Sequence, residues 1–272
     1  MSKVQIVADL HADHWRETGV DPLADAELEE LDGLILAGDI ANKGVTQWPI
    51  VLEKLSRRMD PSRIWLIPGN HDYYGCRIDR EDKLAAAAAR FGAHLAQKSE
   101  LIFGQTRFLC CTLWTNMRLG GQDVGSNMRR AELRMNDYRT IRIEGEGYRR
   151  LHPLATIKLH TDHSMWLEDE LAKPFEGETV VVTHHAPVSE ALPQKEWDDV
   201  PFCYASDLSD LIARYQPDLW CHGHTHHPTD VSVGATRVLN CSVGYPQPKP
   251  KAPDLAHTVI TIAPPEASPA IS

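Results

Sequence analysis

The chain has 272 residues, of which 42% are hydrophobic and 24% charged, a composition typical of a globular protein with a full core. Its formal net charge of −10 argues against a non-specific nucleic-acid binder, since such proteins present a net basic surface. The six cysteines lack C-x-x-C spacing, which predicts reduced, mostly buried thiols. The apolar stretch at the N-terminus is too short for a signal peptide, and no run of 18 apolar residues predicts a membrane span. We therefore expect a cytoplasmic protein.

Short apolar runs alternate with helical patterns along the chain. Buried strands are expected at residues 4–8, 34–37, 64–67, 180–183 and 219–222. Helices are expected at residues 46–58, 80–91, 156–171 and 206–215. Runs at residues 101–103 and 106–111 flank Gly104-Gln105 and predict a hairpin that begins a second, partly antiparallel sheet. Three later strands are expected to complete that sheet, at residues 231–233, 236–239 and 258–262. This alternation predicts an α/β fold.

We expect one domain over residues 1–263 and a flexible tail over residues 264–272. Residues 115–153 differ from the rest, because they carry eight arginines, glycine-rich stretches and too little apolar content for a core of their own. We interpret them as an irregular insertion on the substrate side. Within it, Arg139 or Arg142 is the candidate to bind a non-reacting phosphate or carboxylate of the substrate. The alternative is a solvated loop in which these arginines pair with Glu144 and Glu146.

Five short motifs of Asp, His and Asn residues follow predicted strands. The third is the most specific, because its tetrapeptide is expected by chance in roughly one chain in a thousand of this length. In the fourth, a His pair, we favour His184 as the metal ligand because it stands at the strand end. The first two motifs alone have an ordinary explanation as cap or turn residues, and the His-rich fifth could be taken for a loose metal-scavenging patch. In chain order the motifs are Asp9-Leu10-His11, Gly38-Asp39, Gly69-Asn70-His71-Asp72, His184-His185 and Gly223-His224-Thr225-His226.

These motifs together predict a metal site. Because they all follow strands, we expect them to share one edge of the fold. Three acids or amides and four imidazoles suit two divalent metals, with Asp39 as the bridging ligand and open positions for water and phosphate. A structural zinc site would be closed by four ligands and would more often use cysteines. The seven expected ligands are Asp9, His11, Asp39, Asn70, His184, His224 and His226.

The ordered set of motifs, which spans residues 9 to 226, resembles the calcineurin-like metallophosphoesterases. The resemblance implies an α/β four-layer sandwich of two mixed β-sheets flanked by helices. It implies two divalent metals (Mn, Fe, Zn or Ni), the first held by Asp9, His11, Asp39 and His226 and the second by Asp39, Asn70, His184 and His224. In that family a hydroxide that bridges the metals attacks phosphorus.

The resemblance also implies roles for the remaining motif residues. His71 would protonate the leaving alkoxide or bind a phosphoryl oxygen, with Asp72 holding its ring, and Asn70 would lie beside the substrate. The predicted function is hydrolysis of phosphoester bonds in small molecules, by a phosphodiesterase or phosphatase. A nuclease or nucleotide pyrophosphatase of the same family is the alternative among enzymes. A non-catalytic scaffold of the same fold is disfavoured because His71 and all seven ligands are present. The sequence predicts no oligomeric state.

Overall fold

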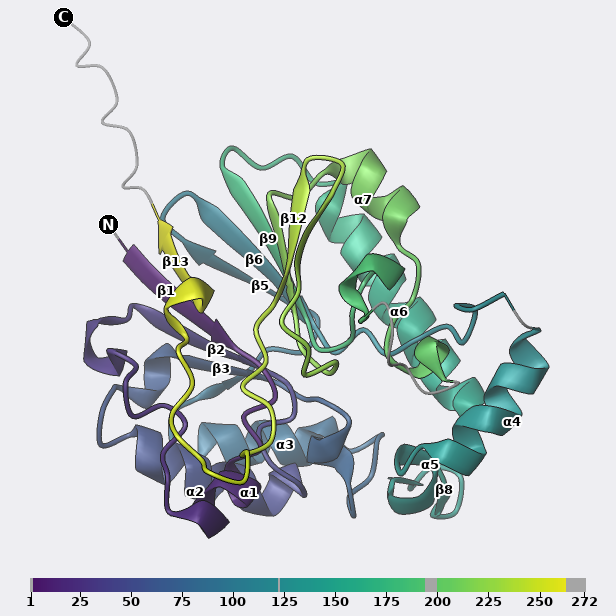
Figure 1. Cartoon of the computed structure of the whole chain (residues 1–272), viewed down its shortest axis with the longest axis horizontal. Coiled ribbons are helices and arrows are strands. Elements are labelled where there is room, and N and C mark those ends of the chain that lie inside the picture. The colour runs from purple at the N-terminus through teal and green to yellow at the C-terminus, as the bar shows by residue number, and fades with distance from the viewer. Residues whose placement is uncertain (1, 122, 194–199, 263–272) are drawn as a thin grey trace, which may run out of the picture.

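The computed structural model describes residues 2–121, 123–193 and 200–262, and the tail expected at residues 264–272 lies outside them (Figure 1). Two large β-sheets lie face to face at the centre of the molecule. The first contains, in spatial order, β13 (Val259–Ile262), β1 (Ser2–Val7), β2 (Gly33–Ala37), β3 (Ile64–Ile67) and β4 (His94–Leu95). The second contains β11 (Asp230–Val233), β12 (Thr236–Asn240), β10 (Leu219–His222), β9 (Glu178–Thr183), β6 (Thr106–Cys111) and β5 (Ser99–Phe103).

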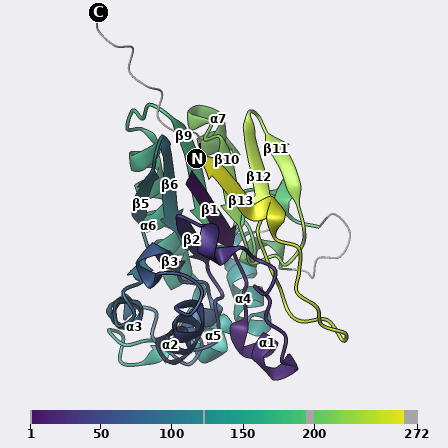
Figure 2. The same ribbon diagram turned by 90° about the vertical axis from the view of Figure 1, so that its left-hand side faces the viewer.

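Helices cover the outer face of each sheet (Figures 1 and 2). The first sheet is covered by α1 (Ala12–Thr18), α2 (Gly44–Leu55) and α3 (Glu81–Ala89), and the second by α6 (Pro153–Leu171) and α7 (Ser209–Tyr215). Side chains alternate along each buried strand, so that Leu34 and Leu36 face α2 while Ile35 and Ala37 face the other sheet. Three apolar layers result, and the expected four-layer sandwich is confirmed.

The strands that carry the motifs run parallel. In the first sheet β1, β2 and β3 pair in parallel, and in the second β6, β9, β10 and β12 do the same. The two sheets also join directly beyond the end of β1, where the Ala8 amide donates to the Cys241 carbonyl at 2.9 Å and the Val243 amide to the Ala8 carbonyl at 2.8 Å. The carboxyl ends of both sheets therefore meet at one edge, which is where parallel sheets place their ligand sites.

Two sequence expectations are wrong. Residues 258–262 do not complete the second sheet, because β13 pairs antiparallel with β1 in the first sheet and places Ile262 in the layer between the sheets. The irregular structure expected at residues 115–153 is not found over residues 124–153, which form α4 (Val124–Arg134), α5 (Asp137–Thr140) and the short hairpin of β7 (Arg142–Ile143) and β8 (Arg149–Arg150). Asp123 caps α4 by accepting a hydrogen bond from the Ser126 amide at 2.9 Å.

The apolar residues of this segment join the core that covers the first sheet, with Ala131, Tyr138 and Ile141 all buried there. All six cysteines are free, as expected, and five of them are buried. Within the described ranges, no helix is long and apolar enough to cross a membrane.

Packing between the two sheets predicts that Phe108 contributes strongly to the free energy of unfolding. Phe108 is fully buried there, in edge-to-face contact with Phe103. Phe108→Ala should lower the free energy of unfolding by about 3–5 kcal/mol, because it leaves a cavity between two sheets that cannot collapse around it. Ile102→Ala on the adjoining strand is the control, since Ile102 is 59% exposed and its loss should cost about 0.5 kcal/mol or less. Urea unfolding measures both, and equal effects would contradict the assignment of this layer.

Candidate metal centre

The structure brings all five motifs together at the shared edge of the sheets. Asp9 and His11 follow β1, Asp39 follows β2, Asn70 follows β3, and the three remaining histidines follow β9 and β10. Five of the seven expected ligands adopt left-handed backbone conformations, with φ of 51° at Asp9, 41° at His11, 51° at Asp39, 65° at His224 and 50° at His226. For a residue with a side chain this conformation costs roughly 1–2 kcal/mol. This free-energy cost falls at the positions where the backbone turns so that a donor atom points into the site.

The glycines of three motifs are required by close contact with these donors. A Cβ atom at Gly38 would lie 2.3 Å from the Nδ1 atom of His184, and one at Gly69 would lie 2.2 Å from the Oδ1 atom of Asp39. At Gly223 it would lie 2.4 Å from the Oδ2 atom of Asp9. Each contact is far shorter than real Cβ contacts, so no larger residue fits unless the donors move.

Four side chains form the first group of donors, with atoms all within 4.8 Å of one another: Asp9, His11, Asp39 and His226. The Nε2 atom of His226 lies 3.0 Å from the Oδ1 atom of Asp9 and 3.1 Å from the Nε2 atom of His11. The Nε2 atom of His11 lies 3.8 Å from the Oδ2 atom of Asp39. Two imidazole nitrogens and two carboxylates therefore converge on one small volume.

The second group consists of Asp39, His184 and His224, joined by Asn70. The Nε2 atom of His184 lies 3.4 Å from the Oδ1 atom of Asp39 and 3.0 Å from the Oδ1 atom of Asn70. The Nδ1 atom of His184 donates to the Ala37 carbonyl at 3.1 Å, which leaves Nε2 for the site. Asp39 thus presents Oδ1 to the second group and Oδ2 to the first, as a bridging ligand would.

Burial controls the charge of these groups. It raises the pKa of Asp39 well above its ordinary value, and the nearby carboxylate of Asp9 raises it further. Burial lowers the pKa of His184 to about 3 and holds the pKa values of His11 and His224 well below the ordinary value. Neutral imidazoles are the form that ligates a metal.

The chemistry of this donor set fits two divalent cations. The Nε2 atom of His224 is buried and has no hydrogen-bond partner in the described part of the chain. Such an orphaned nitrogen costs free energy unless a ligand satisfies it. Carboxylate, amide and imidazole donors around a shared acid suit manganese, iron, zinc and nickel alike.

The expectation that Asp72 holds the ring of His71 is wrong. Asp72 accepts hydrogen bonds from the amides of Gly69 at 2.8 Å, Ala41 at 3.2 Å and Ile40 at 3.3 Å, and from the Trp48 indole at 2.8 Å. Burial raises its pKa to about 7 despite these bonds. Asp72 therefore braces the turns that carry Asp39 and Asn70.

Asn42 takes the place expected for Asp72. The Nδ1 atom of His71 lies 2.9 Å from the Oδ1 atom of Asn42, and the ring stacks on Tyr74 with centroids 4.2 Å apart. The reason is local geometry: His71 and Asp72 are adjacent in one 3-10 turn, so their side chains leave in different directions. The Nε2 atom of His71 points toward the metal ligands, 3.9 Å from the Oδ2 atom of Asp39.

Other residues around the ligands were not singled out by the sequence. Asp137 in α5 accepts hydrogen bonds through Oδ1 from the Asn70 amide nitrogen and from the Tyr74 hydroxyl, each at 2.8 Å. The Ser242 hydroxyl donates to the Oδ2 atom of Asp9 at 2.6 Å. Asn42 lies three residues after Asp39 in the same turn, a spacing that could have indicated it, whereas the sequence carries no such signal for Ser242.

A cavity of about 350 Å³ opens above the two groups of donors. Segment 115–153 contributes Arg134, Met135 and Asn136 to its wall, and Tyr74, Tyr204 and Tyr245 also line it. The structure does not bring the two arginines expected for substrate binding to this wall. The Arg139 guanidinium donates to the Leu133 carbonyl, and Arg142 lies in the β7–β8 hairpin.

The alternative pairing of these arginines is also wrong. Glu144 pairs with Arg77 and Arg80, and Glu146 pairs with His152. The arginine that the segment presents to the donor groups is therefore Arg134.

The family model named calcineurin-like phosphoesterase matches residues 2–228, a range that contains all five motifs. The chain belongs to this family. As a calcineurin-like phosphoesterase it is a hydrolase of phosphoester bonds, and the family uses a dinuclear centre of divalent metals. No curated protein matches the sequence.

Solved structures share the fold. The phosphopantetheinyl hydrolase PptH from Mycobacterium tuberculosis superposes with a TM-score of 0.71 at 19% identity, over 90% of each chain. A dimetal phosphatase from Danio rerio superposes with a TM-score of 0.50 at 13% identity, over 91% of this chain and 89% of that one. At these identities the likeness shows the fold alone.

The shared position of Asp39 predicts the metal content of a variant. Asp39→Ala should abolish stoichiometric binding of both metals, because it removes an oxygen donor from each group. Metal analysis by mass spectrometry after dialysis should give two ions per chain for the wild type and fewer than one for the variant. Asp25→Ala, at an exposed position away from the site, should retain two. Full metal content in Asp39→Ala would contradict the bridging role.

The hydrogen bond between Asp137 and Asn70 predicts that loss of Asp137 weakens binding of the second metal but not of the first. Asp137→Ala frees the Asn70 amide, so the affinity of the second metal should fall about 10–100-fold, the usual effect of losing a residue that orients a ligand. The first metal should bind as before. Asp123→Ala is the matched control, because it removes the cap of α4 in the same segment without touching a ligand. Calorimetric metal titration measures both variants, and equal affinity losses would refute the orienting role.

Proposed function

We propose that this calcineurin-like phosphoesterase hydrolyses phosphodiesters of small molecules at the site formed by Asp39 and the six other donor residues around it. Asp9, His11, Asp39 and His226 would hold one divalent metal, and Asp39, Asn70, His184 and His224 the other. The observation that carries the proposal is the bridging position of Asp39, whose two carboxylate oxygens face different groups of imidazoles at 3.4 and 3.8 Å. When bound, two divalent ions lower the pKa of a water nucleophile and neutralise phosphoryl oxygens.

The chain supplies a proton donor beside that site. Asn42 directs Oδ1 to the Nδ1 atom of His71, and its own amide nitrogen is held by the Oδ2 atom of Asp13 at 2.7 Å. The Nδ1 atom of His71 therefore carries a hydrogen, and Nε2 is the atom that faces the cavity. Burial lowers the pKa of His71 to about 4, so the free ring is neutral and Nε2 must first take up a proton. The protonated ring can then donate to the leaving oxygen or to a phosphoryl oxygen, and stacking on Tyr74 holds it in that orientation.

The size and lining of the cavity support a substrate that is a phosphodiester of an organic molecule. Its volume of about 350 Å³ suits a small molecule, and the tyrosines and Met135 in its wall give apolar surface beside the donors. Asn70 would contact the reacting phosphate, and Arg134 takes over the anion-binding role first assigned to Arg139 and Arg142. The fold shared with a phosphopantetheinyl hydrolase makes phosphopantetheinyl esters suitable compounds for a first assay. The six free thiols support a cytoplasmic location.

The assay that tests this proposal starts from chain stripped with chelator and reloaded with manganese, iron, zinc or nickel. Hydrolysis of bis(p-nitrophenyl) phosphate should depend on the added metal and exceed that of p-nitrophenyl phosphate. His71→Ala should lower kcat about 10²–10⁴-fold, as expected for loss of a general acid, while both metals stay bound. His152→Ala, whose ring pairs with Glu146 at the surface, is the control and should keep full activity.

Two outcomes would overturn the proposal. The first is a fully metal-loaded chain without turnover, which is the result expected of a scaffold. The second is preference for single-stranded DNA or a dinucleotide polyphosphate over small diesters, which would indicate the nuclease or pyrophosphatase alternative.

A further inference from the structure

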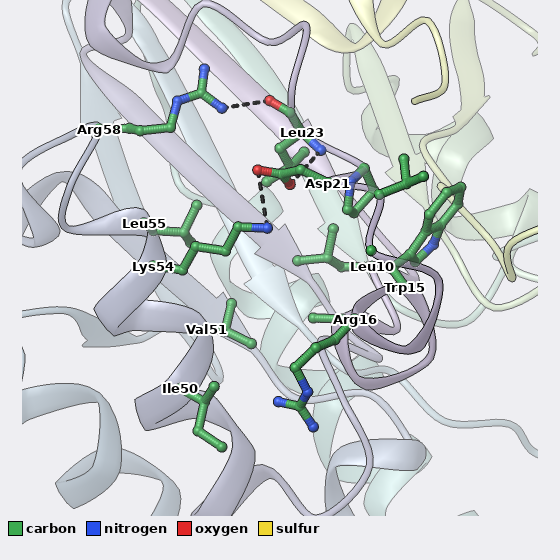
Figure 3. A pocket seen from close by; sticks show the side chains of 14 residues that line it. Leu10, Trp15, Arg16, Asp21, Leu23, Ile50, Val51, Lys54, Leu55 and Arg58 are labelled. Atoms are coloured by element: carbon green, nitrogen blue, oxygen red, sulfur yellow. Dashed lines mark hydrogen bonds and ion pairs between the residues drawn. The ribbon is translucent and has the colours of Figure 1, made fainter. Parts of the chain in front are cut away.

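A second cavity, of about 220 Å³, lies between α1, α2 and the loop of residues 19–23, apart from the cavity above the metal ligands (Figure 3). Apolar side chains form most of its wall. Leu10 and Trp15 stand on one side and Val51 and Leu55 on the other, as Figure 3 shows. Ile50 also lines the cavity although 45% of its surface is exposed, which is unusual for a large apolar side chain. The site therefore offers apolar surface to a molecule from solution.

Three basic side chains line this cavity, and two of them are already engaged. Arg58 donates to the Leu23 carbonyl at 2.6 Å and also contacts Glu29. Lys54 pairs with Asp21 at 3.0 Å. The third, Arg16, differs from both.

The Arg16 guanidinium donates only to the neutral Oε1 atom of Gln47, at 3.2 and 3.3 Å. It forms no ion pair with any residue that the structure describes. The cavity thus combines an apolar wall with one positive charge that no carboxylate balances. This combination suits a monoanion with an apolar body.

One side of this cavity belongs to the same short segment as two of the proposed metal ligands. Leu10 directly precedes His11, and α1 begins directly after it. The Trp15 indole donates to the Gly244 carbonyl at 2.9 Å, and the Gly244 amide donates to the Asp9 carbonyl at 3.0 Å. Any molecule that immobilises Leu10 and Trp15 therefore acts on the backbone that carries Asp9 and His11.

Among the proposed ligands, His11 is the one whose orientation such a molecule would change most. Its Nδ1 atom is buried without a hydrogen-bond partner among the described residues, whereas the Nδ1 atom of His184 is fixed by a carbonyl. The ring of His11 is instead held by stacking on Tyr245, with centroids 4.2 Å apart, and by the start of α1. Tyr245 lines the cavity above the donors, so the second cavity can influence His11 only through Leu10 and the start of α1, which line it.

We propose that this cavity is an effector site for a medium-chain carboxylate, whose apolar body contacts Leu10, Trp15 and Val51 and whose carboxylate pairs with Arg16. At the packing density of protein interiors, about 0.74, a cavity of this size holds roughly ten non-hydrogen atoms, the size of octanoate. Occupation of the cavity holds α1 in place and thereby strengthens metal binding at Asp9 and His11. The effector is distinct from the phosphoester substrate.

The binding test uses octanoate and its neutral counterpart 1-octanol, titrated into the metal-stripped full chain by calorimetry and tryptophan fluorescence. Octanoate should bind with a one-to-one stoichiometry, and Trp15→Phe should remove the fluorescence response. Arg16→Gln should weaken octanoate about three- to tenfold and leave octanol unchanged, since only the charge is lost. Arg57→Gln is the matched control, because Arg57 is an exposed arginine of the neighbouring turn that does not line the cavity.

Blocking the cavity gives a second, independent variant. Ile50→Trp fills the mouth from a partly exposed position, so the fold should be retained while binding of both octanoate and octanol is lost. Absence of saturable octanoate binding to the wild type would overturn the proposal. So would equal octanoate affinity in the wild type and Arg16→Gln.

The coupling to the metal centre is tested without any activity measurement. Saturating octanoate should raise the affinity of the chain for Mn²⁺ about fivefold or more, and Mn²⁺ should raise the affinity for octanoate by the same factor, because linkage is reciprocal. Ile50→Trp should bind Mn²⁺ with an affinity that octanoate no longer changes. Octanoate binding that leaves Mn²⁺ affinity unaltered would refute the effector role.

Discussion

The burial of Asp39 is the constraint on which the rest of the site depends. Its carboxylate is 1% exposed, lies beside a second buried acid, and accepts one backbone hydrogen bond, from the His71 amide at 2.8 Å. An acid in such a place costs several kcal/mol when ionised unless cations or donors compensate it. Burial lowers the pKa values of His11 and His184 beside it, so these two imidazoles are neutral and cannot supply that charge. The two divalent cations that we propose would resolve this conflict, and their charges would also bind the phosphoester.

Much of the backbone around Asp39 serves to bring the donors into contact. Three glycines leave room that a Cβ atom would fill, and five ligands adopt left-handed conformations where their strands end. Asp72 braces the turns through four hydrogen bonds instead of holding the ring of His71. Segment 115–153 adds Asp137, which fixes the amide of Asn70, and Arg134, which lines the cavity. The segment is thus part of the site and not only a cover over it.

The convergence of the donor residues could be predicted from the sequence because parallel strands end at a common edge, so an Asp or His after each buried strand is brought to the same place. Asp9, Asp39 and His184 are predictable for that reason. The partner of His71 is not, since a choice between Asn42 and Asp72 depends on side-chain directions within one turn.

The predictions of the substrate-binding arginine and of the sheet that contains the last strand were wrong for related reasons. Nothing in the spacing of Arg134, Arg139 and Arg142 indicates which one faces the cavity, because the backbone path of this segment depends on how the capped helix α4 packs. β13 could join either sheet by its apolar pattern, and pairing with β1 is a long-range choice made by the tertiary fold.

The claim that two metals share Asp39 is tested most directly by anomalous X-ray diffraction from crystals grown with Mn²⁺. Two anomalous peaks about 3.5–4 Å apart are predicted, the usual separation in two-metal sites, each bound by a different oxygen of Asp39. A single peak, or two peaks of which one has no contact with Asp39, would contradict the account.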